Sequence, residues 1–201
     1  MVLPTAELLI FKWKSIKNIR SMIKNELVKF LREVPLFSEL TREESDDLLE
    51  VVEEISLPAK RIIFQEGDKG DSLFIIKSGR VKISKKYLKG EEKTLALLGP
   101  KSIFGEMALL EDSGRSASAT AEDDVKLLEL SRKDLDGLAE MNPFAGFKIM
   151  FGIARVLSFR LRKMDEEFVN IFSHPFRSIK ELEVLLEKVK QNFISIGWEK
   201  Q

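Results

Sequence analysis

Two residues near the middle of the chain, Glu106 and Arg115, have the chemistry needed to bind a small ligand that carries a hydroxyl group and a phosphate. A carboxylate can accept the hydroxyl proton, and a guanidinium can form a charge-assisted pair with the phosphate. Both lie in the stretch 104–117, where a glycine precedes the carboxylate and small residues flank the arginine. Backbone N–H groups at the start of a helical turn would add donors for an anion. The stretch therefore predicts a binding site, although the same two residues could form a simple surface ion pair.

This stretch resembles the phosphate-binding cassette of the cyclic-nucleotide-binding domain family, which includes the catabolite activator proteins, the regulatory subunit of protein kinase A and the cyclic-nucleotide-gated channels. The family cassette reads approximately F-G-E-[LM]-A-L, a short variable turn, then R-[AST]-A. Residues 104–109 match its first half and residues 115–117 its second. Gly114 stands where many eukaryotic members have proline, and we expect this glycine to loosen the turn before Arg115.

A second stretch, 66–81, resembles the strand-turn-strand signature of the same family. That signature reads G-[DE]-x-[GA]-[DE]-x-[LM]-[YF]-x-[IVL]-x-x-G-x-[VA], and this chain meets every position of it. The resemblance covers roughly residues 35–165. It implies a β-sandwich followed by a long helix that covers the base of the ligand and pairs two subunits.

The resemblance also implies a role for each cassette residue. Glu106 would accept the ribose 2′-hydroxyl proton, and Arg115 would pair with the cyclic phosphate. Ser116 would reach the phosphate or the base, and Gly105 would leave room for the ribose to approach the backbone. The predicted site is completed by Phe104 and by the backbone N–H groups of Met107, Ala108 and Ala117.

The implied ligand is cAMP, with no other cofactor and no metal ion. The catabolite activators carry serine at the position of Ser116 and prefer adenine. A hydroxyl there can also hydrogen-bond the amino group of guanine, so cGMP stays open as the ligand. Arg160 and Met164 fall in the region from which the family draws its contacts to the base, but a slip of one residue rotates a helical face by about 100°.

The composition of the 201-residue chain excludes several classes of protein. It has no cysteine, so disulfides and cysteine-based metal sites or nucleophiles are excluded. Its single histidine and the lack of a nucleophile–base arrangement give no indication of an enzyme. We expect a cytoplasmic protein, because no apolar run approaches the roughly 18 residues that span a bilayer and no signal peptide begins the chain.

The spacing of apolar residues predicts an α+β fold. Between residues 55 and 130, short runs of Ile, Val, Leu and Phe alternate with turn residues, which is typical of an antiparallel β-sandwich or jelly roll. Amphipathic helices are predicted over 5–33 and 143–168, and again over 182–193. Residues 41–44 form a capping box that begins a further short helix.

These elements divide the chain into three predicted parts. Residues 1–34 form an N-terminal amphipathic helix, 35–168 the nucleotide-binding domain with its lid helices, and 169–201 a helical tail. The lysine-rich segment 82–87 is predicted to be the solvated edge of a hairpin rather than a patch that binds nucleic acid. The N-terminal helix is expected to pack on the domain or on a partner subunit. Its basic residues leave binding to a membrane surface open.

The sequence therefore predicts a regulatory module that binds a cyclic nucleotide and signals through its flanking helices. We expect a homodimer paired through 143–168 and a protein effector that the sequence does not identify. The alternative is a transcription regulator of the catabolite-activator type, which would need a DNA-binding part. We do not expect DNA binding, because the chain carries 33 basic and 33 acidic residues and no helix-turn-helix pattern follows Met164.

Overall fold

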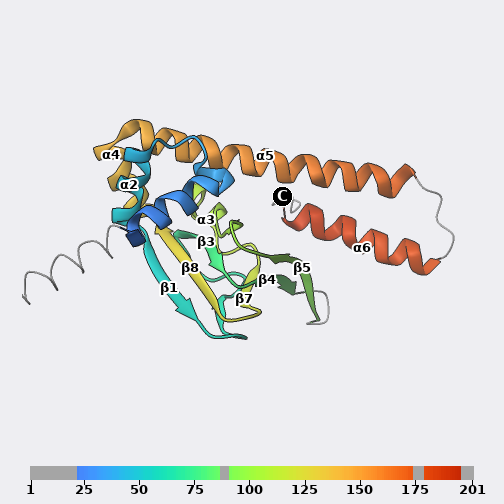
Figure 1. Cartoon of the computed structure of the whole chain (residues 1–201). Coiled ribbons are helices and arrows are strands. Elements are labelled where there is room, and N and C mark those ends of the chain that lie inside the picture. Colours follow the sequence, from blue (N-terminus) through green and yellow to red (C-terminus); the bar gives the residue numbers. More distant parts are fainter. Residues whose placement is uncertain (1–21, 87–90, 174–178, 196–201) are drawn as a thin grey trace, which may run out of the picture.

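The fold is described by a computed structural model, which covers residues 22–86, 91–173 and 179–195. Two four-stranded antiparallel sheets form a sandwich with helices beside it, and this confirms the predicted fold (Figure 1). The first sheet has the order β1 (Glu53–Leu57), β8 (Val125–Ser131), β3 (Ser72–Ser78) and β6 (Ile103–Phe104). The second has the order β2 (Ile62–Phe64), β7 (Ser118–Ala121), β4 (Val81–Lys86) and β5 (Glu92–Leu98).

Strand β3 is buried on both faces because each face packs against a different layer. Leu73 and Ile75 join the core that the first sheet shares with the helices. Phe74 and Ile76 point the other way, into the core between the two sheets. Successive side chains of a strand point to opposite faces, so one strand lines both cores. The first sheet is therefore the middle layer between the second sheet and the helices.

The helices begin and end largely where their capping residues predict. They are 22–33, the 3₁₀ turn η1 (Pro35–Phe37), α2 (Arg42–Val51), α3 (Met107–Leu110), α4 (Arg132–Met141), α5 (Pro143–Ser173) and α6 (Ile179–Ser195). Thr41 and Glu44 form the predicted capping box. The Ser131 hydroxyl accepts a hydrogen bond from the Asp134 N–H and caps α4.

Two boundaries differ from the sequence prediction. Helix α5 continues through residue 168, where the sequence placed a boundary, and ends at Ser173. The predicted N-terminal helix is described only from residue 22, and the break predicted at residues 174–175 lies outside the described residues. The three-part division of the chain stays a prediction, as does its cytoplasmic location.

The prediction that segment 82–87 forms a sheet edge is wrong for its described part. Strand β4 pairs with β7 on one side and with β5 on the other, so β5 is the edge strand. Lys85 is only 7% exposed, and its Nζ lies 3.5 Å from an oxygen of Glu66. The order of the strands depends on pairing with residues far away in the sequence. The lysines of one strand do not indicate which strands pair with it.

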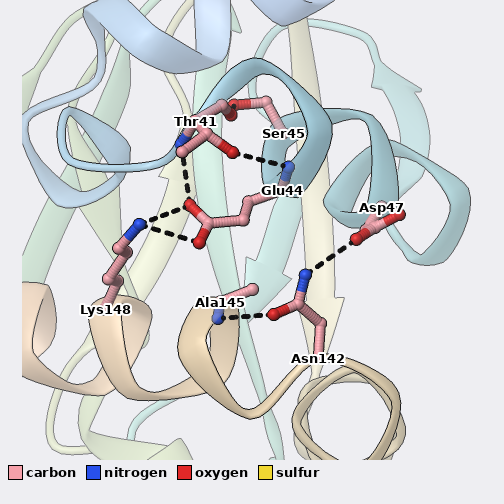
Figure 2. A network of polar contacts seen from close by, with 7 residues as sticks. All are labelled: Thr41, Glu44, Ser45, Asp47, Asn142, Ala145 and Lys148. Atoms are coloured by element: carbon pink, nitrogen blue, oxygen red, sulfur yellow. Dashed lines mark hydrogen bonds and ion pairs between the residues drawn. The ribbon is translucent and has the colours of Figure 1, made fainter.

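A polar network joins α2 to the start of α5 (Figure 2). The Lys148 Nζ donates to both carboxylate oxygens of Glu44 at 2.7 Å. The same carboxylate accepts the Thr41 N–H at 2.7 Å, and the Asn142 amide donates to Asp47 at 3.0 Å. Glu44 is 7% exposed, so its carboxylate is largely withdrawn from water. These contacts fix the first turns of α5 on α2.

Helix α5 extends past the sandwich, and α6 runs back beside it (Figure 1). Gly152 brings α5 close to η1: a Cβ on this residue would lie 2.4 Å from the Leu36 carbonyl oxygen. Within the described residues, no helix combines the length and the apolar content needed to cross a membrane. The helical layer thus touches the sandwich along one part of α5 and leaves the rest of that helix outside it.

Candidate functional site

The cassette lies between β6 and β7, and a glycine begins its turn. Strand β6 ends at Phe104, Gly105 follows with a positive φ of 76°, and α3 begins at Met107. A side chain is strained in this conformation, and a Cβ on Gly105 would lie 2.7 Å from the Arg115 Nη1 atom. The approach of a ribose to Gly105 stays a prediction. In the structure, the atom nearest to this hypothetical Cβ is Nη1 of Arg115.

Arg115 points inward and is 7% exposed. Its Nη1 donates to the Ser72 carbonyl oxygen at 2.6 Å and to the Gly105 carbonyl oxygen at 3.1 Å. Its Nη2 lies 3.3 Å from the Ser72 hydroxyl oxygen. The Nε atom is buried and has no hydrogen-bond partner. One edge of the guanidinium is thus fixed by neutral oxygens, while the buried Nε has no acceptor among the described residues.

No direct ion pair with another described residue neutralises the charge of Arg115. Burial lowers the pKa of the guanidinium below its ordinary value, and acidic groups around it oppose that effect through space. Those groups are Asp71, Glu129, Asp68 and Glu106, in order of decreasing influence. Among the described residues, none of these carboxylates forms a salt bridge with Arg115. A buried cation without a counterion favours an anionic ligand.

The turn before Arg115 is held against the β2–β3 connection. The Arg115 N–H donates to the Asp68 carbonyl oxygen, and the Gly67 N–H donates to the Arg115 carbonyl oxygen, both at 2.8 Å. A Cβ on Gly114 would lie 2.7 Å from the Gly67 carbonyl oxygen, so glycine permits this close approach. The looseness expected from Gly114 stays a prediction.

Glu106 is also buried, at 3% exposure, but its partner is a residue of α5. The Arg160 Nη1 forms a hydrogen bond and ion pair with the Glu106 carboxylate. The Arg160 Nη2 donates to the Ile103 carbonyl oxygen at 2.8 Å. The surface ion pair between Glu106 and Arg115 that the sequence left open is therefore absent. Instead, the carboxylate connects the cassette to α5.

The remaining predicted residues surround these two charges unevenly. Phe104 is 3% exposed and stacks on Phe74 with ring centroids 5.2 Å apart. The Ala108 N–H makes a long hydrogen bond of 3.3 Å to the Gly105 carbonyl oxygen. Ser116 is exposed, and its hydroxyl lies 3.6 Å from the sulfur of Met107. Ala117 is half-buried at the start of the return to β7.

The two leucines of the cassette differ in burial. Leu109 is buried in the core with Leu135, Leu138 and Ile149. Leu110 is 45% exposed. A turn of only four residues presents one apolar face to the helices, and Leu110 lies off that face.

Several residues that shape the site were not assigned to it from the sequence. Ser72 and Gly70 lie in the 66–81 signature, which could have indicated them. Arg132 binds the end of α3: its Nη2 lies 2.8 Å from the carbonyl oxygens of Ala108 and Glu111. No local pattern marks this role of Arg132. In the part of the chain that the structure describes, no cluster of His, Cys, Asp and Glu could hold a metal ion.

Comparison with known proteins agrees with this geometry. The family model described as "Cyclic nucleotide-binding domain" matches residues 54–142. The cyclic AMP receptor protein of Thermus thermophilus is 41% identical over 133 residues, which are 66% of this chain and 60% of that protein. A cAMP-dependent protein kinase regulatory subunit of Emericella nidulans is 36% identical over 103 residues, which are 51% of this chain and 24% of that protein.

A solved structure gives the same result for the fold. The N-terminal domain of a transcriptional regulator from Streptomyces coelicolor A3(2) is 34% identical, with a TM-score of 0.60 over 69% of this chain and 94% of that domain. The match to the Thermus receptor spans 60% of that protein's length, and only this part is compared. The family match, the sandwich and the cassette geometry lead to one conclusion: this chain belongs to the cyclic nucleotide-binding domain family.

Proposed function

We propose that this chain is a regulatory module that binds cAMP and passes the signal through its helices, rather than an enzyme. One observation carries the proposal: Arg115 is buried, lacks a counterion among the described residues and keeps an unpartnered Nε atom. A cyclic phosphate carries one negative charge and would supply both the charge and the acceptor. An anion at this position would convert an unfavourable buried cation into a favourable pair.

The other cassette residues would orient the ligand around that phosphate. Glu106 would accept the ribose hydroxyl proton, and the exposed Ser116 hydroxyl would reach the phosphate or the base. Relatives named for cAMP support cAMP as the ligand. A relative named as a cGMP-dependent protein kinase, 31% identical over 117 residues, keeps cGMP as the competing nucleotide. Adenine preference is therefore part of the proposal and is tested with it.

Signalling would begin at the contact between Glu106 and Arg160. A ligand hydroxyl on the Glu106 carboxylate would share or replace the acceptor that now holds Arg160 of α5. A ligand shifts an equilibrium only by its differential affinity for two states, and this contact supplies such a difference. Release or reseating of Arg160 would change the position of α5, and with it the surface offered to a protein effector.

We further propose that the chain pairs with a second copy through α5. One side of this helix bears exposed apolar side chains: Phe147 at 68%, Met150 at 41%, Phe151 at 49% and Leu161 at 47% exposure. Phe147 and Phe151 stack with centroids 6.0 Å apart, which makes a flat apolar surface. Burial of such a surface between two copies would remove it from water.

Light scattering tests the dimer. At micromolar concentration we expect a mass of about twice the 23.0 kDa of one chain. The double variant Phe147→Ser, Phe151→Ser should shift the mass toward a single chain. Phe159→Ser is the matched control, since Phe159 is 64% exposed but lies about 120° around the helix from Phe147. A parent mass near 23.0 kDa would overturn this part of the proposal.

We do not propose DNA binding for this chain, although some of the proteins that it resembles are transcription regulators. After α5 the structure describes one helix, α6, of 17 residues. After Ser173, the described residues include no second helix that could follow or precede α6 across a tight turn, as major-groove recognition would need. The helices α5 and α6 are instead proposed as the surface that meets an effector.

Calorimetric titration of the purified chain with cAMP and with cGMP tests the central proposal. We expect cAMP to bind more tightly than cGMP. Arg115→Ala should weaken cAMP binding by about 2–4 kcal/mol, because it removes a charge-assisted pair in a buried site. Arg80→Ala is the matched control, since Arg80 forms an exposed ion pair with Asp123. Equal binding by Arg115→Ala and the parent would rule out the assigned cassette.

A further inference from the structure

Phe64, at the end of β2, lies against the guanidinium that is proposed to bind the phosphate. The Arg115 Cζ atom is 4.3 Å from the centroid of the Phe64 ring and 5.6 Å from that of Phe74. The Phe64 ring in turn packs on Phe74 and Phe104, each with centroids 5.9 Å apart. The Phe64 ring, as part of this aromatic cluster, therefore covers one face of the Arg115 guanidinium.

The Phe64 ring restrains the guanidinium in a direction that the hydrogen bonds do not. Nη1 is fixed by the carbonyl oxygens of Ser72 and Gly105, which act along one edge of the guanidinium. Bonds to one edge still allow the group to swing about that edge. A ring 4.3 Å away limits this swing and attracts the cation through its negative face. The guanidinium is thereby held against the Phe64 ring, with Nε buried and without a hydrogen-bond partner among the described residues.

Gly70 limits the same group from nearby backbone. A Cβ on Gly70 would lie 2.2 Å from the Arg115 Nε and 2.5 Å from its Cζ. The absence of a side chain at this position therefore leaves the space that the Nε side of the guanidinium needs. The ring of Phe64 and the bare backbone of Gly70 together define where Nε can lie.

We propose that Phe64 is a positioning residue of the phosphate site, whose ring face orients Arg115 so that Nε meets the anion. The inference rests on the proposed function, because the anion is the cyclic phosphate of the ligand. Phe64 is half-buried and also packs on the core between the sheets, so its role in packing must be separated from its role in orientation.

A double-mutant cycle separates the two roles. Titration with cAMP is carried out on the parent, on Phe64→Leu, on Arg115→Ala and on the double variant. We expect Phe64→Leu to weaken binding about threefold to tenfold in the parent, in the range of a partly desolvated cation–π contact. In the Arg115→Ala background, Phe64→Leu should change the affinity little, because the group that it orients is gone.

Two further variants sharpen the result. Phe64→Tyr keeps the aromatic face and should bind cAMP nearly as tightly as the parent. Ile63→Ala removes apolar packing from the same core and the same strand, so it should lower stability while the affinity stays unchanged. In the ligand-free protein, the Nε–H resonance of Arg115 should move when Phe64 is replaced by Leu, because the ring current is lost.

The possible outcomes distinguish the proposed function from the proposed role of Phe64. A parent that binds neither cAMP nor cGMP would overturn the proposed function and this inference together. A parent that binds, with Phe64→Leu equally tight or with the same loss in both backgrounds, would overturn only the role of Phe64. A loss confined to the chain that retains Arg115, together with rescue by Phe64→Tyr, would establish it.

Discussion

Two buried carboxylates hold α5 through basic side chains of that helix, and they do so differently. Near the start of α5, Glu44 accepts Lys148 on both oxygens and also accepts the Thr41 N–H (Figure 2). Farther along, Glu106 of the cassette pairs with Arg160. The first carboxylate is satisfied within the helical layer, whereas the second belongs to the proposed ligand site. One contact therefore fixes α5, and under the proposed mechanism the other would make α5 respond to the cassette.

The exposure of the basic partners adds to the contrast. The side chain of Lys148 is 28% exposed, and that of Arg160 is 42% exposed. A more exposed cation regains more hydration when its pair is broken, so the loss of the Arg160 contact is less unfavourable.

The largest effect should appear in stability. We expect Glu44→Gln to lower the free energy of unfolding by about 2 kcal/mol, because it removes the charge that balances a half-buried ammonium group. Glu106→Gln should lower it by about 1 kcal/mol or less. Urea denaturation measures both, with Glu43→Gln as the control, an exposed glutamate beside Glu44 on α2. Equal losses for Glu44→Gln and Glu106→Gln would contradict the proposed difference between the two carboxylates.

Lowering the pH should reduce the contribution of Glu44 to the stability of the fold. Burial alone would raise the pKa of Glu44, but the hydrogen bonds and charge of Lys148, with the bonds to Thr41, lower it below the ordinary 4.5. A carboxylate with a lowered folded-state pKa stabilises the fold above its unfolded pKa and loses this contribution as pH falls through the folded value. The stability gap between the parent and Glu44→Gln should therefore be constant near neutrality and shrink below pH 4.5.

The ligand should distinguish the two carboxylates in the opposite sense. We expect Glu106→Ala to weaken cAMP binding about tenfold, less than Arg115→Ala, because it removes one hydroxyl acceptor and no phosphate partner. Glu111→Ala, an exposed carboxylate at the end of the cassette helix, is the control and should leave the affinity unchanged. Calorimetry measures each variant. A Glu106→Ala chain that binds as tightly as the parent would remove the ribose role from this residue.

The smallest change should appear only in dynamics. With the parent, hydrogen exchange at saturating cAMP should show protection at 104–117 and altered exchange in 143–168, while 73–84 changes little. In Arg160→Ala, the response of 143–168 should fall while protection at 104–117 persists, because the contact that transmits it is gone. Arg162→Ala, an exposed arginine on the same helix, should respond as the parent does. An undiminished response in Arg160→Ala would place the coupling elsewhere.

Much of the fold and the position of the cassette could be predicted because their signals are local. The capping box at Thr41, the turns between strands and the apolar spacing of α5 depend on neighbouring residues. The interior place of β4 could not be predicted, since its pairing with β7 joins residues far apart in the sequence.

The same limit applies to the site. Glu106 and Arg115 were identified by residue type and spacing, but their partners were not. Arg160 was placed only in the lid region, because a slip of one residue turns a helical side chain by about 100°. The contact of Phe64 with Arg115 depends on how β2 and the cassette pack across the sandwich, which no short pattern encodes.

The close approach of Gly152 to Leu36 has a mechanical consequence for the length of α5. Arg160 lies about two turns beyond this contact, and Ser173 lies about 30 Å beyond it at 1.5 Å per residue. If the contact acts as a fulcrum, a displacement of about 2 Å at Arg160 is a tilt of roughly 10°, and the far end of α5 then travels about 5 Å. In the proposed mechanism the helix would act as a lever, with a short arm from Gly152 to Arg160 and a long arm from Gly152 to Ser173, and it would magnify a movement shorter than a hydrogen bond.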